Sequence, residues 1–355
     1  MASPLHTKVC DLLGMPHPIL QTGMGWVATP ELTAAASNAG AFGFLAAATI
    51  PPREVAGEIR KVKALTTRPF GVNFLMDAPG AEEISEALIA ENVAAAGYNR
   101  APRGDLITRL KDAGIACIPT CGAPRHAAKA EQLGADAIIV QGSEGGGHTG
   151  PIPTSLLVSQ CVDAVSVPIV AAGGFRDGRG LVAALAFGAA GIAMGTRFLL
   201  TRESPVPKTT TDRYLSAAVN DVRITTEVDG LPQRVVVNEL IHQLETSNRV
   251  TLLLRALRSG LAFRKASGAS LGDLLRSALA LRRHERLTRA QTLMAANAPM
   301  LAKRAMVEGD PVGGYLPSGS VAGVIDDLPS CEELVSRIVE EAERTLATLS
   351  AGTPS

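Results

Sequence analysis

Short apolar runs recur along roughly the first 200 residues, separated by longer amphipathic or alanine-rich stretches. Runs of this length between helix-like segments are typical of buried parallel strands in successive βα units. Eight such units predict a (β/α)8 TIM barrel, and a doubly wound open sheet is the alternative. The runs begin 21 to 31 positions apart, at Pro18, Gly43, Phe70, Val93, Ala116, Ala137, Pro168 and Gly191.

The stretches between the runs predict helices. We expect the side chain of Thr29 to cap the first of them. Near the C-terminus, Ser330 precedes an amphipathic stretch and Glu333 follows three positions later, which is the pattern of a capping box on a closing helix. The clearest helical stretches are residues 29–40, 52–66, 123–135 and 177–190.

The βα repeat stops near Leu200. Residues 1–202 and 300–355 are therefore expected to form the barrel. Residues 203–299 are expected to form a mainly helical insertion after the eighth strand, which serves as a lid or substrate-binding part.

The insertion carries a concentration of positive charge. Ten basic and two acidic residues lie between Arg249 and Arg289, in a chain whose formal net charge is zero. A solvated helix face produces such a pattern, and so does a surface that binds the phosphate groups of a ligand. The candidates for phosphate binding are Arg249, Arg282, Arg283 and Arg286.

Composition narrows the class of protein. With 46% hydrophobic residues and no net charge, the chain can build a large core and has no overall attraction to nucleic acid or to a membrane surface. Aromatic residues make up 3%, too few for platforms that stack bases. No stretch reaches the ~20 apolar residues of a membrane span, and the N-terminus has no signal- or transit-peptide pattern. A cytoplasmic protein is expected.

The five cysteines are scattered and odd in number, as in a reduced protein without disulfides. Cys117 and Cys121 stand four positions apart, but no second pair or nearby histidine cluster completes a zinc site. No metal is expected.

A histidine follows three glycines at the end of the sixth apolar run, in the stretch VQGSEGGGHTG over residues 140–150. Glycines bring no side chain to a core, so such a stretch indicates close approach of backbone to another group. His148 could bind a metal, hold a phosphate or move a proton, and a metal lacks partner ligands here. Imidazole is suited to proton transfer near neutral pH, so His148 is the candidate catalytic base.

Further candidates stand where the strands end, because the active site of a barrel lies at the carboxyl ends of its strands. Backbone N–H groups at the seventh and eighth strand ends can hold a phosphate. Flexible backbone and a thioether can lie against a flat ring. Amide side chains can form hydrogen bonds with the polar edge of that ring. Ordinary turns and buried amides that satisfy backbone are the alternatives. The residues concerned are Gly173, Gly174, Gly195 and Thr196 for the phosphate, Gly23 and Met24 for the ring, and Asn73 and Gln141 for its edge.

Five motifs occur in order: PILQTGMGWVA, FGVNFLM, IIVQGSEGGGHTG, PIVAAGGF and GIAMGTRFL. Together they resemble the nitronate monooxygenase superfamily of FMN-dependent (β/α)8-barrel flavoproteins, which also includes enoyl-thioester reductases. The resemblance implies that His148 is the catalytic base beside the flavin. It also implies that FMN is held by Gly23, Met24, Asn73, Gln141, Gly146, Gly147, Gly173, Gly174, Gly195 and Thr196.

Three later stretches, TTEVDGLPQRVVVNEL, TLMAANAPM and VAGVIDDLPSCEELV, narrow the resemblance. They are similar to the branch that acts in steroid ring catabolism and dehydrogenates a bicyclic hydroxy-oxo-indane-carboxyl-CoA ester. One position departs from the family, which tends to have Gly-Gln near the flavin. Here the stretch is PSGSVAG, with Ser320 at the place of the glutamine, so the alignment of the substrate there needs water or another group.

The resemblance therefore implies α,β-dehydrogenation of a CoA thioester, with His148 as base, hydride transfer to flavin N5 and the basic segment on the CoA phosphates. One alternative is a nitronate monooxygenase that oxidises alkyl nitronates with O2. Another is an NAD(P)H-dependent enoyl-thioester reductase, and a third is a non-enzymatic protein that binds FMN or CoA. The electron acceptor and the direction of the reaction leave no mark in the sequence, and a homodimer is possible.

Overall fold

The computed structural model describes residues 4–99, 102–246 and 289–352. The chain divides into two compact units. The first holds residues 1–145, 149–205 and 325–355, and the second holds residues 146–148 and 206–324. The candidate phosphate-binding residues Arg249, Arg282, Arg283 and Arg286 lie outside the described residues.

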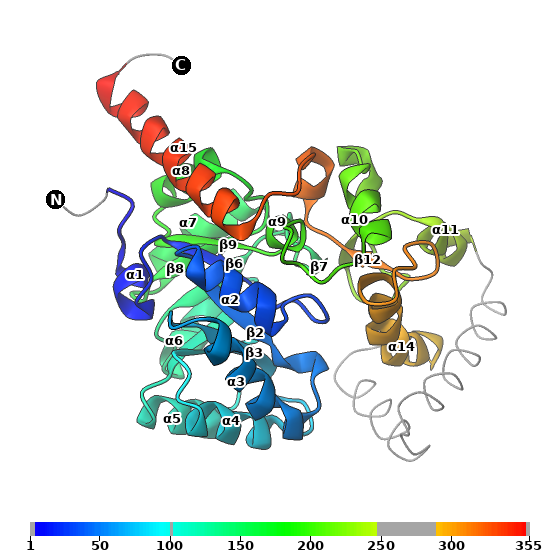
Figure 1. Ribbon diagram of the computed structural model, residues 1–355, viewed down its shortest axis with the longest axis horizontal. Helices are drawn as coiled ribbons and strands as arrows, with labels where there is room; N and C mark the ends of the chain where they lie inside the picture. The colour runs from blue at the N-terminus through cyan, green and yellow to red at the C-terminus, as the bar shows by residue number, and fades with distance from the viewer. Residues whose placement is uncertain (1–3, 100–101, 247–288, 353–355) are drawn as a thin grey trace. The chain divides into compact units, whose positions relative to one another are not determined.

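The first unit is a closed barrel of eight parallel strands (Figure 1). Every strand overlaps or directly follows the start of one of the eight apolar runs, so the predicted TIM barrel is confirmed. Runs rich in valine, isoleucine and alanine form these strands because both faces of each strand are covered. The strands are β1 (Ile19–Gln21), β2 (Phe42–Ala46), β3 (Gly71–Leu75), β4 (Ala95–Asn99), β5 (Ala116–Cys121), β6 (Ile138–Gln141), β8 (Ile169–Ala172) and β9 (Gly191–Met194).

Helices alternate with the strands and surround them in Figure 1. Buried side chains from helices and strands, such as Ile59, Val72 and Leu110, form the core between the two layers. The helices of this unit are α1 (Lys8–Leu13), α2 (Pro30–Asn38), α3 (Val55–Leu65), α4 (Ala81–Ala90), α5 (Gly104–Asp112), α6 (Pro124–Gln132), α7 (Thr154–Ala164), α8 (Gly178–Ala186), α9 (Thr196–Leu199) and α15 (Cys331–Ala351), with short 3-10 turns η1 (Ala47–Thr49) and η2 (Pro52–Glu54).

The two predicted helix caps have different outcomes. Ser330 caps α15 as expected, because its hydroxyl accepts from the Glu333 N–H at 3.1 Å while the Glu333 carboxylate accepts from the Ser330 N–H at 3.0 Å. Thr29 stands at the N-cap of α2, but its side chain makes no capping bond and that expectation is wrong. Pro30, the first residue of α2, has no N–H, so the helix needs one hydrogen-bond acceptor fewer at this end.

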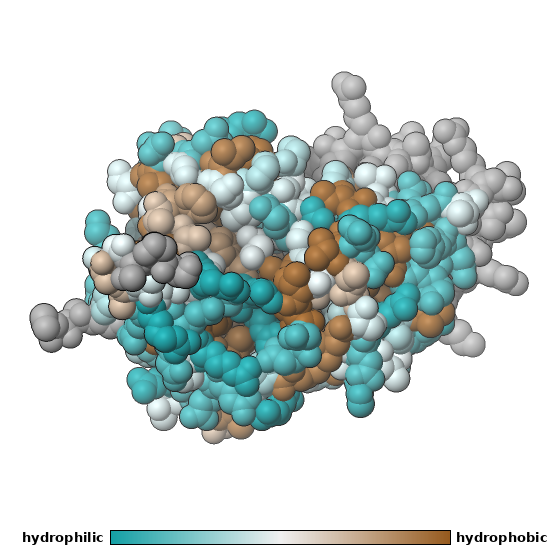
Figure 2. All heavy atoms as spheres, turned by 90° about the horizontal axis from the view of Figure 1, so that it is seen from above, coloured by the Kyte–Doolittle hydropathy of each residue, from teal (hydrophilic) through white to brown (hydrophobic). Residues whose placement is uncertain are grey.

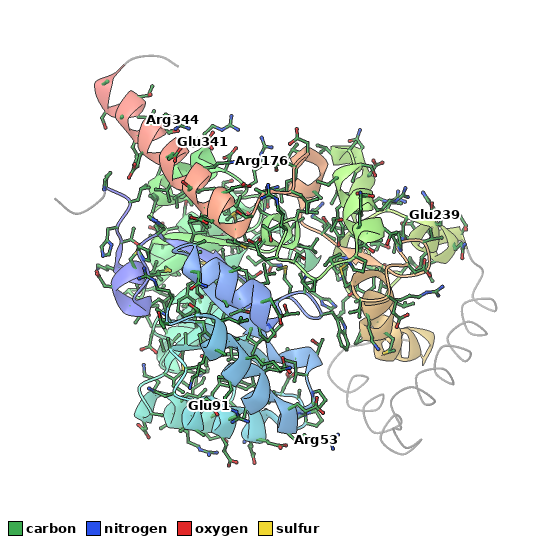
Figure 3. The ribbon with its side chains drawn as sticks, in the orientation of Figure 1. Arg53, Glu91, Arg176, Glu239, Glu341 and Arg344 are labelled. Carbon is green, nitrogen blue, oxygen red and sulfur yellow. The ribbon has the colours of Figure 1, made fainter. Side chains whose placement is uncertain are left out.

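The C-terminal helix closes the barrel layer by packing on α8. A Cβ added to Gly178 would lie 2.4 Å from the backbone nitrogen of Ala342, so the two helices approach closely there. The Glu341 carboxylate, labelled on α15 in Figure 3, accepts from the Gly178 N–H at 2.8 Å. This contact supplies a partner for one of the otherwise unsatisfied N–H groups in the first turn of α8.

The second unit combines a four-stranded sheet with helices. The central strand β11 pairs antiparallel with β10, β12 and β7, so the expected mainly helical insertion also contains a sheet. Residues 300–324, which we expected with the barrel, cluster with this unit, because β12 pairs with β11 and the Asn238 amide donates to Pro311 and Gly314. The described elements are β7 (Gly147–His148), α10 (Lys208–Leu215), η3 (Val219–Asp221), β10 (Val222–Thr225), β11 (Gln233–Val236), α11 (Glu239–Thr246), α14 (Arg289–Met306), β12 (Leu316–Pro317) and η4 (Ser320–Val324).

The surface mixes residue types. Figure 2 shows hydrophilic and hydrophobic residues side by side on one face of the molecule. Within the ranges that the structure describes, no helix is both long and apolar enough to cross a membrane.

Candidate active site

Gly23 follows β1 and lies directly against Asn73 of β3. A Cβ on Gly23 would stand 2.4 Å from the Asn73 Cβ and 3.0 Å from its Oδ1, closer than real side-chain atoms approach. A Cβ on Gly97 of β4 would likewise lie 3.0 Å from Asn73 Nδ2. Asn73 therefore fits where it is because glycine stands both in the turn after β1 and on the adjacent strand β4. The structure brings together Gly23 and Asn73, two residues that the sequence had singled out separately.

Met24 and Gly195 form a second close pair at the same rim. The Thr22 N–H donates to the Met194 carbonyl at 3.1 Å, which joins the ends of β1 and β9. A Cβ on Gly195 would lie 3.2 Å from Thr22 Oγ1 and 3.3 Å from the Met24 sulfur. Thr196 follows as the first residue of α9 and is buried. The barrel closure thus places the first and last candidate motifs next to each other.

A third group lies at the ends of β6 and β8, which pair with Gln141 opposite Ala172. A Cβ on Gly145 would stand 2.6 Å from Gln141 Cγ, and a Cβ on Gly173 would stand 2.8 Å from the Gly145 nitrogen. Gly173 and Gly174 have φ of 99° and 87°, in the left-handed region that glycine tolerates. The backbone at this strand end is thus free of side chains over two successive residues.

Glu144 holds the loop after β6 in place, and the sequence analysis missed it. Its Oε2 accepts from the Thr154 N–H at 2.9 Å, the Thr154 hydroxyl at 2.8 Å and the Ser143 hydroxyl at 3.0 Å. Partial burial opposes its ionisation, but these donors stabilise the anion, and the net effect lowers the pKa of Glu144 below its ordinary value. The sequence did offer one sign of this role, because Glu144 is the only carboxylate in the glycine-rich stretch over residues 140–150.

The segment Gly146–His148 is anchored through its chain neighbours. Gly145 donates its N–H to the Gly142 carbonyl at 3.0 Å, and the Thr149 hydroxyl donates to the same carbonyl at 3.0 Å. Between them the chain passes into the second unit, where Gly147 pairs with Arg234 and His148 with Gln233. Gly146 must be glycine, since a Cβ there would lie 2.7 Å from the backbone nitrogen of Gly319.

His148 is hydrogen-bonded to Asp229, a residue that the sequence analysis did not select. Nε2 and Asp229 Oδ2 lie 2.7 Å apart, with the imidazole 53% exposed and the carboxylate 7% exposed. Burial opposes ionisation of Asp229, but the hydrogen bond and charge of His148, with help from Gln233 and the Leu231 N–H, lower its pKa overall. An imidazole and a carboxylate, both able to take part in proton transfer, therefore form a hydrogen-bonded pair within the second unit.

Trp26 is a third residue that the sequence analysis left unassigned. It adopts φ of 66°, which a residue with a bulky side chain rarely takes, and its N–H donates to the Thr49 hydroxyl at 3.2 Å. Such strain concentrates at functional sites. It lies in the turn after β1, two positions from Met24.

These rim positions fit a flat, phosphate-bearing cofactor. At Gly23, Gly145, Gly173 and Gly195 an added Cβ would meet atoms of the protein itself, so the glycines let the strand ends pack closely and bring Asn73, Gln141 and Met24 to the rim. An amide side chain can bind the polar edge of a flat ring, and a thioether can lie against its face. All five cysteines are buried and free. In the described part of the chain, no three His, Cys, Asp or Glu side chains gather as a metal site would require.

The family model for nitronate monooxygenase matches residues 6–102 and 90–341. The chain belongs to the nitronate monooxygenase family. This is a family of flavin-dependent oxidoreductases, and the protein is accordingly an oxidoreductase.

Two relatives share half of the sequence. A Mycobacterium tuberculosis protein is 50% identical over 350 residues, and a Rhodococcus jostii protein is 48% identical over 349 residues. Each match covers 98% of this chain and 99% of the relative. Both are named (3aS,4S,5R,7aS)-5-hydroxy-7a-methyl-1-oxo-octahydro-1H-indene-4-carboxyl-CoA dehydrogenase.

More distant relatives carry other names. A probable nitronate monooxygenase of Staphylococcus saprophyticus is 32% identical and covers 68% of this chain and 81% of its own. The solved structure of FabK from Thermotoga maritima is 31% identical, with a TM-score of 0.77 and coverage of 98% of this chain and 99% of its own. Nitroalkane oxidase from Streptomyces ansochromogenes is 28% identical, with a TM-score of 0.75 and coverage of 95% and 99%.

Proposed function

We propose that this protein is an FMN-dependent dehydrogenase that introduces an α,β double bond into the CoA thioester of a bicyclic hydroxy-oxo-indane carboxylate. The observation that carries the proposal is the identity of 50% and 48% to two dehydrogenases with that substrate in their names, over 98% of this chain. Those matches include nearly all of the second unit, which holds Asp229. The nitronate monooxygenase relative covers 68% of the chain.

The barrel rim supplies the candidate cofactor site. Gly23 and Met24 would lie against the flavin ring, Asn73 and Gln141 would bind its polar edge, and Gly146 and Gly147 would approach it with backbone. The phosphate would be held by Gly173, Gly174, Gly195 and Thr196. Bare backbone and a hydroxyl at the ends of β8 and β9 support this assignment, since TIM barrels commonly bind phosphate there. When bound, FMN supplies the acceptor for two electrons and the β-hydrogen.

His148 is proposed as the base that removes the α-proton, which the thioester carbonyl acidifies. Its imidazole is half-exposed and so can be reached by a substrate, and it is one residue from Thr149, whose hydroxyl is fixed to the loop after β6. General-base catalysis contributes about 10²- to 10⁴-fold, and a fixed orientation of the thioester contributes at least as much. The α-proton goes to the imidazole, and its electron pair becomes part of the new double bond.

The four candidate arginines of the basic segment lie outside the described residues, and we propose that they bind the CoA part of the substrate. Arg249, Arg282, Arg283 and Arg286 would bind the CoA phosphates, because guanidinium groups form paired hydrogen bonds with phosphate. Cytoplasmic location and a homodimer stay predictions from the sequence.

A reductase is a further candidate, because the superfamily that the motifs resemble also includes enoyl-thioester reductases. Nitronate oxidation is the third, supported by the relative in Staphylococcus saprophyticus. Product analysis separates the three. The purified protein is incubated with the bicyclic CoA thioester and an artificial electron acceptor, and the mass of the acyl-CoA product is measured by mass spectrometry.

The proposal predicts loss of two hydrogens from the acyl group, with no change in a parallel sample of propionate 3-nitronate. An unchanged thioester together with oxidised nitronate would contradict it. Conversion of the unsaturated thioester by NAD(P)H, with no reaction of the saturated one under any acceptor, would assign the reductase instead.

A further inference from the structure

The hydrogen bond between His148 and Asp229 joins residues 81 positions apart. Strand pairing holds the first of these residues, and a hydrogen bond from backbone to side chain holds the second. His148 lies opposite Gln233 in the antiparallel pair of β7 and β11. Asp229 belongs to the connection between β10 and β11, where its Oδ1 accepts from the Leu231 N–H at 3.0 Å. The carboxylate therefore cannot turn away from the imidazole without losing a backbone hydrogen bond.

We infer that Asp229 is a positioning residue that keeps the proton of the His148 ring on Nε2, so that Nδ1 is the atom that accepts the α-proton of the thioester. This inference rests on the proposed function, because that function supplies the proton to be removed. Beyond that function, Asp229 becomes part of the catalytic machinery, and Nδ1 is the reacting atom of the His148 ring.

The chemistry of the two groups supports the assignment. An ionised carboxylate only accepts hydrogen bonds, and a neutral imidazole carries one donor and one acceptor nitrogen. The nitrogen bonded to Asp229 must then be the donor, which places the lone pair on Nδ1. Burial raises the pKa of Asp229, but the hydrogen bond to His148 and the weaker ones to Gln233 and the Leu231 N–H lower it overall, so the carboxylate is ionised at neutral pH.

The surroundings of Asp229 leave it as the negative charge beside the ring. Gln233 is fully buried close to the carboxylate, and its amide helps to lower the pKa of Asp229. Tyr315 also faces Asp229, and burial first and the charge of Asp229 second raise the pKa of its phenol, so it stays neutral. The charge of Asp229 is thus available to the imidazole.

The charge matters in the reaction itself. As the α C–H bond breaks, its proton would form the Nδ1–H bond and its electron pair would form the double bond. A bound flavin would supply the acceptor for the β-hydrogen and its electron pair. The ring then becomes a cation, and a carboxylate 2.7 Å from Nε2 stabilises that cation more than the neutral ring. Asp229 should therefore affect the rate of the chemical step more than the binding of the thioester.

The test begins with the wild-type protein carrying ¹⁵N-labelled histidine. Long-range proton–nitrogen NMR reports which ring nitrogen carries the hydrogen, and His148→Gln identifies the His148 signals among the six histidines. The proposal predicts hydrogen on Nε2. Hydrogen on Nδ1 in the wild-type protein would overturn it, whatever the activity.

Kinetics of Asp229→Asn supply the second readout. The amide can donate to Nε2 and so favours the wrong tautomer; we expect flavin reduction by saturating thioester to slow by about 10²-fold or more, with KM little changed. Asp229→Glu should recover part of the rate because it restores a carboxylate. The control is Asp212→Asn, the same change at an exposed position on α10, which should reduce at the wild-type rate.

The outcomes are distinguishable. If thioester does not reduce the wild-type protein, the proposed function fails, and the tautomer measurement still tests the role of Asp229. If wild type reacts and Asp229→Asn, folded to the same melting temperature as Asp212→Asn, reacts equally fast, the positioning role is wrong. If Asp229→Asn does not fold, the wild-type tautomer and the Asp229→Glu rate decide.

Discussion

Asn73 occupies the space that a side chain on Gly23 would need, with 2.4 Å between its Cβ and the Cβ that alanine would bring. No side chain can be added at position 23 without moving the ends of β1 and β3 or the side chain of Asn73. This relationship links a turn glycine to a polar residue on another strand, and both belong to the proposed flavin site.

Gly23→Ala should weaken flavin binding. Forcing a methyl group into filled space costs about 1–3 kcal/mol, which is about 5- to 150-fold in the Kd of the flavin if the strain falls on the site. The ratio of visible flavin absorbance to protein absorbance after dialysis measures the occupancy. Full occupancy after dialysis would mean that the strand ends relax and that Asn73 does not hold the cofactor.

Gly57→Ala is the matched control for that variant. Gly57 lies inside α3, and a Cβ there meets nothing within 4 Å. Alanine at an unstrained helix position should leave the flavin in place and stabilise the fold by about 0.5–1 kcal/mol. Thermal unfolding of the two variants separates a change at the site from a general effect of replacing glycine.

His148→Ala should retain the flavin and lose the reaction. We expect the rate of flavin reduction by thioester to fall by about 10²- to 10⁴-fold, the range of a lost general base, while the visible spectrum persists. Stopped-flow absorbance measures both. His126→Ala, an exposed histidine on α6, is the control and should react as wild type does. If the His148→Ala protein reacts at the wild-type rate, His148 is not the catalytic base.

Glu144 makes the protein sensitive to acid. Its folded pKa lies below the ordinary value of 4.5, so its contribution to stability is complete above that pH and is lost as pH falls through the folded pKa. Melting temperatures should therefore drop on acidification below about pH 4.5. Glu144→Gln should start lower at pH 7, by about 1–3 kcal/mol for the lost charged hydrogen bonds, and decline less steeply.

Exposed Glu83 on α4 provides the comparison, since Glu83→Gln removes a carboxylate without touching this loop. Its melting temperature should follow the wild-type pH curve. If the melting temperatures of wild type and Glu144→Gln fall in parallel as the pH is lowered, the ionised form of Glu144 does not stabilise the protein.

Arg197 and Asp327 form an ion pair at 2.7 Å in which the arginine is 5% exposed and the aspartate 44% exposed. Asp327→Asn should destabilise the protein by about 1–3 kcal/mol, because it leaves a buried guanidinium without its charge partner. Arg337→Gln removes the exposed partner of the same carboxylate and should cost less than about 1 kcal/mol. Denaturant unfolding measures both, and equal costs would mean that burial of Arg197 is not what counts.

The barrel could be predicted because its information is local. Each strand is a short apolar run followed by glycine or a turn, and β6 with its glycine-rich end shows the pattern most clearly. The capping box of Ser330 and Glu333 is local in the same sense. Candidate residues at the strand ends followed from the rule that parallel strands end at one rim, without any measured contact.

The partner of His148 could not be predicted in this way. Asp229 and Gly230 stand between two alternating stretches, and such a dipeptide indicates a hairpin. Nothing in that local pattern says that β11 also pairs with the two residues of β7, because register between distant segments is set by the folded structure. The hairpin of β10 and β11 therefore had a local signal, whereas the pairing of β11 with β7 and β12 had none.

One measurement tests the central claim most directly. The purified protein, yellow with bound flavin, is mixed without oxygen with the saturated bicyclic CoA thioester, and a parallel sample receives propionate 3-nitronate. The account predicts rapid bleaching of the blue absorption band by the thioester and little by the nitronate. Bleaching by the nitronate alone would contradict it and make this protein a nitronate-oxidising member of its family.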